Sequence, residues 1–389
     1  MTTTTDSPAA PPGVAPIFSP LFAINPEPTL SHLREHDPVH RLPGPEPVYV
    51  LTRAADAEAA LRDPACSAAG GQEERSRRSG APVSMLNTDG AEHDSLRRPG
   101  AALLGPAAVR ASSGALAAAA GNLVSELPAR FDITSAYAEP LATLALLEIL
   151  GLADHARFGD FDRHARAVSV AIDPMPSPAQ AAQGALAMGE FDGYVERLVA
   201  TAPNSLLAQL PSRFGITPEQ ARGIVSLAVV GGWSPLAEVV TTALELALRD
   251  DGPADADLEP WCDDVIRWHT PIPFVARRTI SALTVPSGAI PAGAQVLIHL
   301  GSANRDGRRF PDPDRVDAQR PAASAHLAFG HGAHVCLGTA LVRAVVPLAI
   351  RSLRSQRPGA RVASSLFVWR PGIFPRRPMS AIVHGGVAT

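Results

Sequence analysis

The residue best suited to chemistry in this chain is Cys336. Gly330, Gly332 and Gly338 surround it, and glycine permits turns and close backbone approach that other residues cannot make. An amphipathic run beginning at Leu337 predicts a helix directly after the thiol, and the N–H groups and positive dipole end of a helix start favour a thiolate. A thiolate on a glycine-shaped loop is a good metal ligand, so the loop predicts that Cys336 binds a metal.

The other two cysteines, Cys66 and Cys262, show no short metal-type spacing to Cys336 or to each other. An odd number of widely spaced cysteines argues against a disulfide framework. Each of the two is expected to be a small buried hydrophobe.

The elements that must position the loop are mostly helical. Strands are expected over 48–51, 279–285 and 295–300. Apolar residues recur at helical spacing over 98–126, 138–151, 184–201, 217–249, 259–269 and 337–355. Between 301 and 335 the helical pattern stops, and a structureless segment of this length in a compact domain is usually functional. The pattern predicts a mainly α protein with small β-sheets (α+β), with one domain over residues 15–389 after a disordered tail over 1–14.

The bulk composition points to a globular protein and leaves a small-molecule role open. The 389 residues are 46% hydrophobic and 19% charged, with a formal net charge of -4. This charge gives no reason to expect nucleic acid or an anionic membrane as partner. The first residues lack a cationic patch followed by an apolar run, so no signal peptide is expected, nor is a membrane span. We therefore predict a cytoplasmic protein.

The loop itself reads Phe329-Gly330-His331-Gly332-Ala333-His334-Val335-Cys336-Leu337-Gly338. It resembles the haem-binding signature Phe-Gly-x-Gly-x-His-x-Cys-x-Gly of the cytochrome P450 family, soluble bacterial branch, at every fixed position. The resemblance covers about residues 15–389. It implies the cytochrome P450 fold, with haem b (iron protoporphyrin IX) held between a distal I helix and a proximal L helix, and Cys336 as the iron ligand. In this family the cysteine thiolate pushes electron density onto the iron and favours O–O cleavage.

The resemblance also implies which side chains hold the haem propionates. His93 and Arg97 match the His-x-x-x-Arg of the family's C helix, and an i, i+4 pair shares one helix face. Arg278 falls where the family places another propionate-binding arginine, and His334 matches the basic position two residues before the cysteine. Cationic donors against two carboxylates form strong charge-assisted bonds.

A buried cluster near the haem is expected from the same resemblance. The family pairs a Glu-x-x-Arg turn with a later arginine, which Arg320 would supply here. This chain has Asp264-Val265-Ile266-Arg267 in that turn, one methylene shorter at the acid. Asp264 can still pair with Arg267 at i+3, so the cluster is expected with altered geometry.

The distal helix departs from the family pattern, which has Gly, any residue, an acid and Thr for proton delivery. The matching stretch is Gly231-Gly232-Trp233-Ser234-Pro235, with Ser234 at the acid and Pro235 at the Thr. A register shifted by one puts Trp233 at the acid and Ser234 at the alcohol. Both registers lack the acid. Pro235 lacks an N–H and is expected to kink the helix and expose carbonyls to water.

Several segments are expected to contact the substrate. Trp233 and Phe274 are the large side chains expected to face the ligand, against the alternative that an aromatic at helical spacing belongs to the core. The remaining predicted pocket residues are Ile272, Val275, Ile373 and Phe374.

The resemblance implies an oxidoreductase: a haem-thiolate monooxygenase or oxidase that activates dioxygen with electrons from a ferredoxin and its reductase. Arg98, Arg110 and Arg343 are plausible ferredoxin contacts. The substrate is expected to be a small secondary metabolite that is hydroxylated, oxidatively coupled or cyclised. The weak relay leaves two alternatives: a peroxide-using enzyme, or a degenerate haem protein that binds a ligand without oxidising it.

Overall fold

The computed structural model describes residues 15–70, 84–169, 177–202, 205–249, 252–321, 325–363 and 382–384. The tail predicted over 1–14 lies outside the described residues, as do the predicted pocket residues Ile373 and Phe374. One domain over 15–389 stays a prediction.

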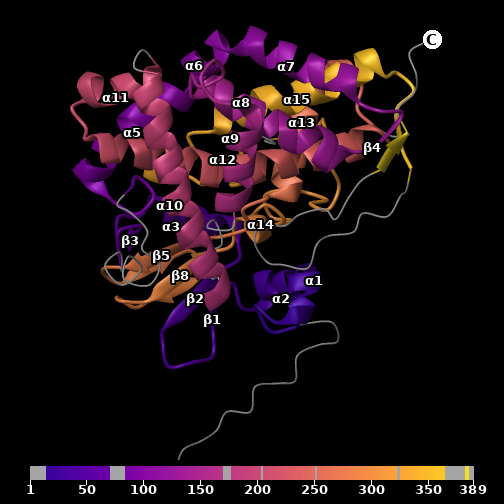
Figure 1. Ribbon diagram of the computed structural model, residues 1–389. Coiled ribbons are helices and arrows are strands. Elements are labelled where there is room, and N and C mark those ends of the chain that lie inside the picture. Colours follow the sequence, from indigo (N-terminus) through magenta and orange to yellow (C-terminus); the bar gives the residue numbers. More distant parts are fainter. Residues whose placement is uncertain are drawn as a thin grey trace, which may run out of the picture.

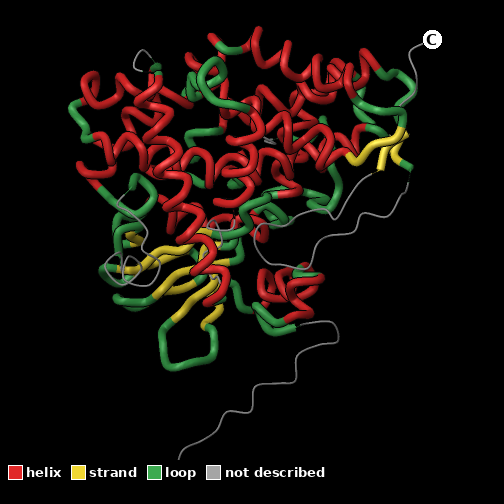
Figure 2. The backbone as a smooth tube through the Cα atoms, viewed as in Figure 1, coloured by secondary structure: helices red, strands yellow, loops and turns green. Residues whose placement is uncertain are grey.

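Helices make up most of the molecule and gather on one side of a smaller sheet region (Figures 1 and 2). This arrangement confirms the predicted mainly α class with small β-sheets. In chain order the described α-helices from α5 onward, apart from the short α14 (Leu300–Ala303), are α5 (Gly90–Leu104), α6 (Pro106–Ala111), α7 (Ser113–Glu126), α8 (Glu139–Ile149), α9 (Phe158–Val168), α10 (Pro178–Thr201), α11 (Leu206–Phe214), α12 (Pro218–Ala247), α13 (Leu258–His269) and α15 (Thr339–Gln356).

The helix predicted over 98–126 is three helices, because α5 ends at Leu104, Pro106 opens α6, and α6 ends at Ala111 before α7 begins. Proline suits the first turn of a helix but cannot continue the preceding one. The pattern also missed several elements: α1 (Pro20–Ile24), α2 (Glu27–His36), α3 (Ala54–Arg62), α9 and α11. Short segments of this kind contain too few apolar repeats to be recognised.

The main sheet has five strands in the order β1-β2-β8-β5-β3. Its strands are β1 (Val39–Arg41), β2 (Val48–Leu51), β3 (Cys66–Ser67), β5 (Val275–Thr279) and β8 (Gln295–Ile298). Only the β2–β8 pair is parallel. The antiparallel pairing of β5 with β3 places the 275–279 region beside Cys66, next to the start of α5.

Two smaller sheets complete the described β structure. The hairpin of β6 (Leu283–Val285) and β7 (Gly288–Ile290) follows β5. The strand predicted over 279–285 therefore covers the last residue of β5 and all of β6, while residues 280–282 belong to neither strand. The other sheet joins β4 (Arg130–Asp132), β9 (Arg361–Val362) and β10 (Ile382–His384).

Helix α12 runs through the helical part and packs against α8, α13 and α15. Thr217 caps its start through a capping box with Gln220, and Pro218 occupies its first position. In the described part of the chain, α12 alone is long and apolar enough to cross a membrane, but 72% of its most apolar window is buried in the protein. Such burial is typical of a core helix.

Candidate active site

The cysteine loop has the backbone shape that its glycines suggest. Gly330 and Gly332 have φ values of 70° and 74°, the left-handed region that favours glycine. A Cβ on Gly332 would lie 2.6 Å from the carbonyl oxygen of Leu61, so a larger residue does not fit there. The Cys336 N–H donates to the Phe329 carbonyl at 2.8 Å, which closes the loop. Cys336 is accessible, unlike the buried Cys66 and Cys262.

The thiol of Cys336 lies at the start of α15, as predicted. Removal from bulk water raises its pKa, while hydrogen bonds from the Gly338 and Thr339 N–H groups and the positive charge of Arg97 oppose that rise. The helix start therefore favours the thiolate as expected, but desolvation outweighs it.

Three of the predicted haem-binding side chains converge beside the loop. His93 and Arg97 both lie on α5, and the Arg97 Nη2 donates to the Val335 carbonyl at 2.6 Å. The His93 and His334 rings pack with centroids 4.3 Å apart. Asp89, which sequence reasoning missed, accepts from His334 Nε2 at 3.0 Å and from Ser67 at 2.6 Å. Its place just before α5 was the available signal.

The prediction for Arg278 is wrong in position, because side chains alternate between the two faces of a strand. Arg278 is half-buried and its Nε donates to the Gly293 carbonyl at 3.2 Å. Arg277 is buried on the opposite face of β5. Burial of the His334 imidazole lowers its pKa, and the positive charge of Arg277 lowers that pKa further. Arg277 is therefore the arginine of this strand that shares the space of His334 and the loop.

The two arginines make a matched pair for experiment. We expect Arg277→Ala to weaken haem retention about tenfold or more, since a charge-assisted hydrogen bond contributes about 1.5–3 kcal/mol. Arg278→Ala should change it far less. The rate of haem transfer to excess apomyoglobin measures both, and equal rates for the two variants would contradict the assignment.

These residues fit a haem. No group of three or more His, Cys, Asp and Glu residues in the described chain could hold a bare metal ion, so a metal at Cys336 must bring its other ligands with it. The His93 Nε2 atom is buried and has no hydrogen-bond partner among the described residues. An orphaned buried polar atom costs free energy unless a ligand satisfies it. A thiol, two histidines and two arginines suit an iron macrocycle bearing two carboxylates.

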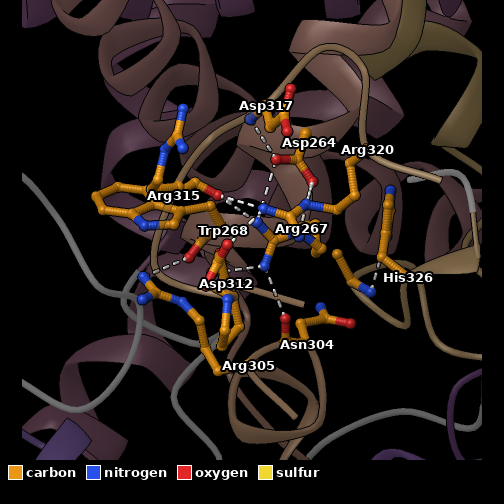
Figure 3. Close-up of polar contacts among 12 residues, drawn as sticks. Asp264, Arg267, Trp268, Asn304, Arg305, Asp312, Arg315, Asp317, Arg320 and His326 are labelled. Atoms are coloured by element: carbon orange, nitrogen blue, oxygen red, sulfur yellow. Dashed lines mark hydrogen bonds and ion pairs between the residues drawn. The ribbon is translucent and has the colours of Figure 1, made fainter. Parts of the chain in front are cut away.

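The predicted cluster of one acid and two arginines is present (Figure 3). Asp264 accepts from Arg267 Nε at 2.5 Å and Nη2 at 3.1 Å, and from Arg320 Nε at 2.9 Å. The backbone N–H of Asp317 adds a fourth bond to Asp264 at 2.7 Å. All three charged side chains are buried, and Arg267 also donates to the carbonyls of Asn304, Pro313 and Arg315. The shorter acid therefore still reaches both arginines.

The distal stretch differs from its prediction at Trp233. Helix α12 continues through Pro235 as one α-helix. Trp233 is buried, and its Nε1 donates to Thr143 of α8 at 2.8 Å while the Arg166 guanidinium of α9 lies 5.1 Å from its ring centroid. Trp233 thus packs against α8 and α9 and does not face a ligand. This agrees with the alternative that an aromatic at helical spacing belongs to the core.

Ser234 has a partner that sequence reasoning missed. Its hydroxyl donates to Glu238 Oε1 at 2.5 Å, and both side chains are buried. The spacing of i and i+4 on one helix was the signal. An acid is therefore present beside the alcohol, one turn later than the family pattern has it.

The remaining predicted pocket residues lie around the start of β5. Phe274 is buried in a cluster with Val50 and Leu297, and its ring packs on Phe18 at 5.9 Å. It belongs to the core on the outer face of the sheet, so the prediction that it faces the ligand is wrong. Ile272 and Val275 are half-buried.

This geometry defines a class: a helical oxidoreductase fold with a single-cysteine loop suited to a haem iron. The family model described as Cytochrome P450 matches residues 258–353. The monooxygenase PikC of Streptomyces venezuelae is 28% identical over 387 residues, covering 90% of this chain and 88% of PikC. Cytochrome P450 130 of Mycobacterium tuberculosis is 29% identical and covers 92% of this chain and 94% of that protein. The solved structure of the P450 monooxygenase TamI is 27% identical, with a TM-score of 0.81, 95% of this chain covered and 99% of TamI.

The chain belongs to the cytochrome P450 family and is of the bacterial type. It is an oxidoreductase of the P450 kind, and the family carries a haem cofactor.

Proposed function

We propose that the protein is a cytoplasmic haem-thiolate monooxygenase in which Cys336 ligates the iron of haem b. The observation that carries this proposal is the accessible Cys336 thiol on a glycine loop, beside the packed rings of His93 and His334. Arg97, His93, His334 and Arg277 would hold the propionates. Bound haem supplies the oxidising chemistry, and the protein orients the substrate and manages protons.

We propose a small secondary metabolite as substrate, hydroxylated or oxidatively coupled or cyclised. The similarity to TamI, solved with tirandamycin C bound, supports this class. The half-buried residues Leu227, Val230 and Ile272 would contribute apolar surface to the substrate pocket.

Electrons are proposed to come from an acidic ferredoxin and its reductase. Arg98 and Arg110 are exposed and suit such a partner. Arg343 suits it less, because both oxygens of Asp263 accept from its guanidinium, at 2.7 and 3.0 Å. Of the three basic residues predicted for this surface, Arg98 and Arg110 are thus the better candidates.

The alternative oxidant is hydrogen peroxide, favoured by Ser234 and Pro235 at the two positions of the usual relay. The pair of Ser234 and Glu238 favours the dioxygen route, since it returns an acid to the same helix.

The test has two steps. First, the purified protein should take up haem, and its ferrous-CO complex should show the thiolate-type Soret band. Second, substrate candidates are supplied with either peroxide or the ferredoxin, reductase and NAD(P)H. We expect product with the redox chain, with NAD(P)H use coupled to product. A protein that takes up no haem overturns the proposal, and turnover with peroxide alone replaces it by the alternative.

A further inference from the structure

Asp89 precedes α5 but its side chain does not cap that helix. An aspartate just before a helix normally accepts a hydrogen bond from an N–H group of the first turn. The Asp89 side chain makes no such bond, although its backbone has the extended conformation of a capping residue, with φ -132° and ψ 167°. The helix that follows Asp89 therefore does not explain why an acid stands at this position.

The Asp89 carboxylate is held by β3 and by the residues after it. Its Oδ2 atom accepts from the Ser67 hydroxyl at 2.6 Å and from the Ala69 N–H at 3.0 Å. Ser67 lies in β3, which pairs antiparallel with β5. The main sheet thus fixes one oxygen of the carboxylate, and with it the direction of the other.

The other oxygen contacts a histidine of the cysteine loop. Asp89 Oδ1 lies 3.0 Å from His334 Nε2. Partial burial raises the pKa of Asp89, but hydrogen bonds from Ser67, Ala69 and His334 lower it to about 2. The carboxylate is therefore ionised at neutral pH and can only accept, so the proton of this contact lies on His334 Nε2.

The His334 ring in turn packs on His93. The two ring centroids are 4.3 Å apart, and His93 is buried. The His93 Nε2 atom has no hydrogen-bond partner among the described residues. Because closely packed side chains restrict each other's rotation, a fixed His334 ring also restricts the His93 ring. A line of contacts thus runs from β3 through Asp89 and His334 to the nitrogen that a propionate would satisfy.

The negative charge of Asp89 does not by itself suit this place. The site is proposed to bind the two carboxylates of haem, and like charges repel. The Asp89 side chain is 39% exposed, so solvent weakens this repulsion without reversing its sign. Charge alone would make Asp89 unfavourable for haem binding, whereas a role in holding His334 accounts for an acid here.

We propose that Asp89 is a positioning residue for the haem, which holds the His334 ring through Nε2 and so keeps both His334 and His93 turned toward the propionates. This inference rests on the proposed function, which places the propionates beside these two rings.

The rate of haem transfer from the ferric protein to excess apomyoglobin measures this role. Asp89→Asn removes the charge that orders His334, and we expect transfer about tenfold faster than in the wild type. If Asp89 acted only through its charge, its removal would slow the transfer. Asp94→Asn is the matched control, because Asp94 lies 3.1 Å from the other histidine, His93, but is 74% exposed. This control should stay within about twofold of the wild-type rate.

Two further variants separate an action through His334 from a structural role of Asp89. Ser67→Ala removes one hydrogen bond to the carboxylate and keeps the His334 contact, so it should speed transfer much less than Asp89→Asn does. In a His334→Ala background the Asp89→Asn change should have almost no effect, because the contact through which it acts is gone. A role of Asp89 in holding β3 would persist in that background.

The proton of His334 gives a readout that does not depend on haem loss. The ferrous-CO protein is diamagnetic, so NMR spectra that correlate the ring nitrogens of isotope-labelled histidine with the ring protons show which nitrogen is protonated. The His334→Ala spectrum assigns the signals. We expect a proton on His334 Nε2 in the wild type, and a mixture of the two neutral tautomers in Asp89→Asn.

The inference is overturned if Asp89→Asn slows haem transfer or leaves it unchanged, or if its effect is undiminished in the His334→Ala background. Should Asp89→Asn fail to fold, the wild-type spectrum decides, and a His334 Nε2 without a proton contradicts the inference. A wild-type protein that takes up no haem contradicts the proposed function itself, so the two failures are distinguishable.

Discussion

Cys336→Ala is expected to abolish the thiolate-type Soret band of the ferrous-CO complex, while the protein still folds. The variant removes the sulfur and leaves a methyl group on the same loop. The loop is held by the Cys336 N–H bond to the Phe329 carbonyl, which alanine keeps, and by the glycines that alanine does not disturb. Any haem that still enters between His93, Arg97 and His334 would lack the protein's proposed sulfur ligand.

Cys262→Ala is the matched control for this change. Cys262 is buried in α13, and burial raises the pKa of its thiol, with neighbouring acids adding to the effect. A neutral buried thiol acts as a small hydrophobe, so its loss costs only some packing. The Cys262→Ala protein should keep the thiolate band. A thiolate band that survives in Cys336→Ala would place the iron ligand elsewhere.

Asp264→Ala is expected to cause a large loss of stability. Asp264 is fully buried and accepts four hydrogen bonds, from Arg267, Arg320 and the backbone of Asp317. Its removal leaves two buried guanidinium groups without their counter-charge, which costs about 3–5 kcal/mol. Denaturant unfolding, followed by helical circular dichroism, measures the change in the free energy of unfolding.

The preceding residue in the chain supplies the control. Asp263 pairs with Arg343 at a partly exposed site, where the side chains are 16% and 40% exposed. An ion pair of this kind contributes about 0–1 kcal/mol, so Asp263→Ala should cost little. Comparable losses in the free energy of unfolding for Asp264→Ala and Asp263→Ala would show that the buried cluster stabilises the protein no more than a partly exposed ion pair does. Asp264→Glu should fall between them, because it keeps the charge but adds a methylene to a packed site.

Much of the site could be predicted from the chain alone because it is local in sequence. The loop from Phe329 to Gly338 contains its own turns, its ligand and the start of α15. The pairs His93 with Arg97 and Asp264 with Arg267 each lie within about one helical turn. Helical spacing also indicated α8, α10, α12, α13 and α15, since long apolar repeats are a strong signal.

What the sequence could not decide is which way side chains face across elements. Arg277 and Arg278 are adjacent and identical in type, and only the pairing of β5 with β3 and β8 decides which one lies toward His334. Phe274 and Trp233 could each line a pocket or pack in the core. Their packing partners, Phe18 and Thr143, come from distant segments of the chain. The direction in which a side chain points is a property of the packed structure, because a rotation of one strand or helix exchanges a pocket residue for a core residue.

The sequence by itself determined the family, the helical class and Cys336 as the candidate iron ligand, because these depend on residue types at fixed short spacings. The tertiary structure alone showed that Arg277 lies beside the loop, that Trp233 belongs to the core, and that the Ser234 hydroxyl donates a hydrogen bond to the buried Glu238. These depend on how α12, α8 and β5 pack, and packing is set by contacts between residues far apart in the chain.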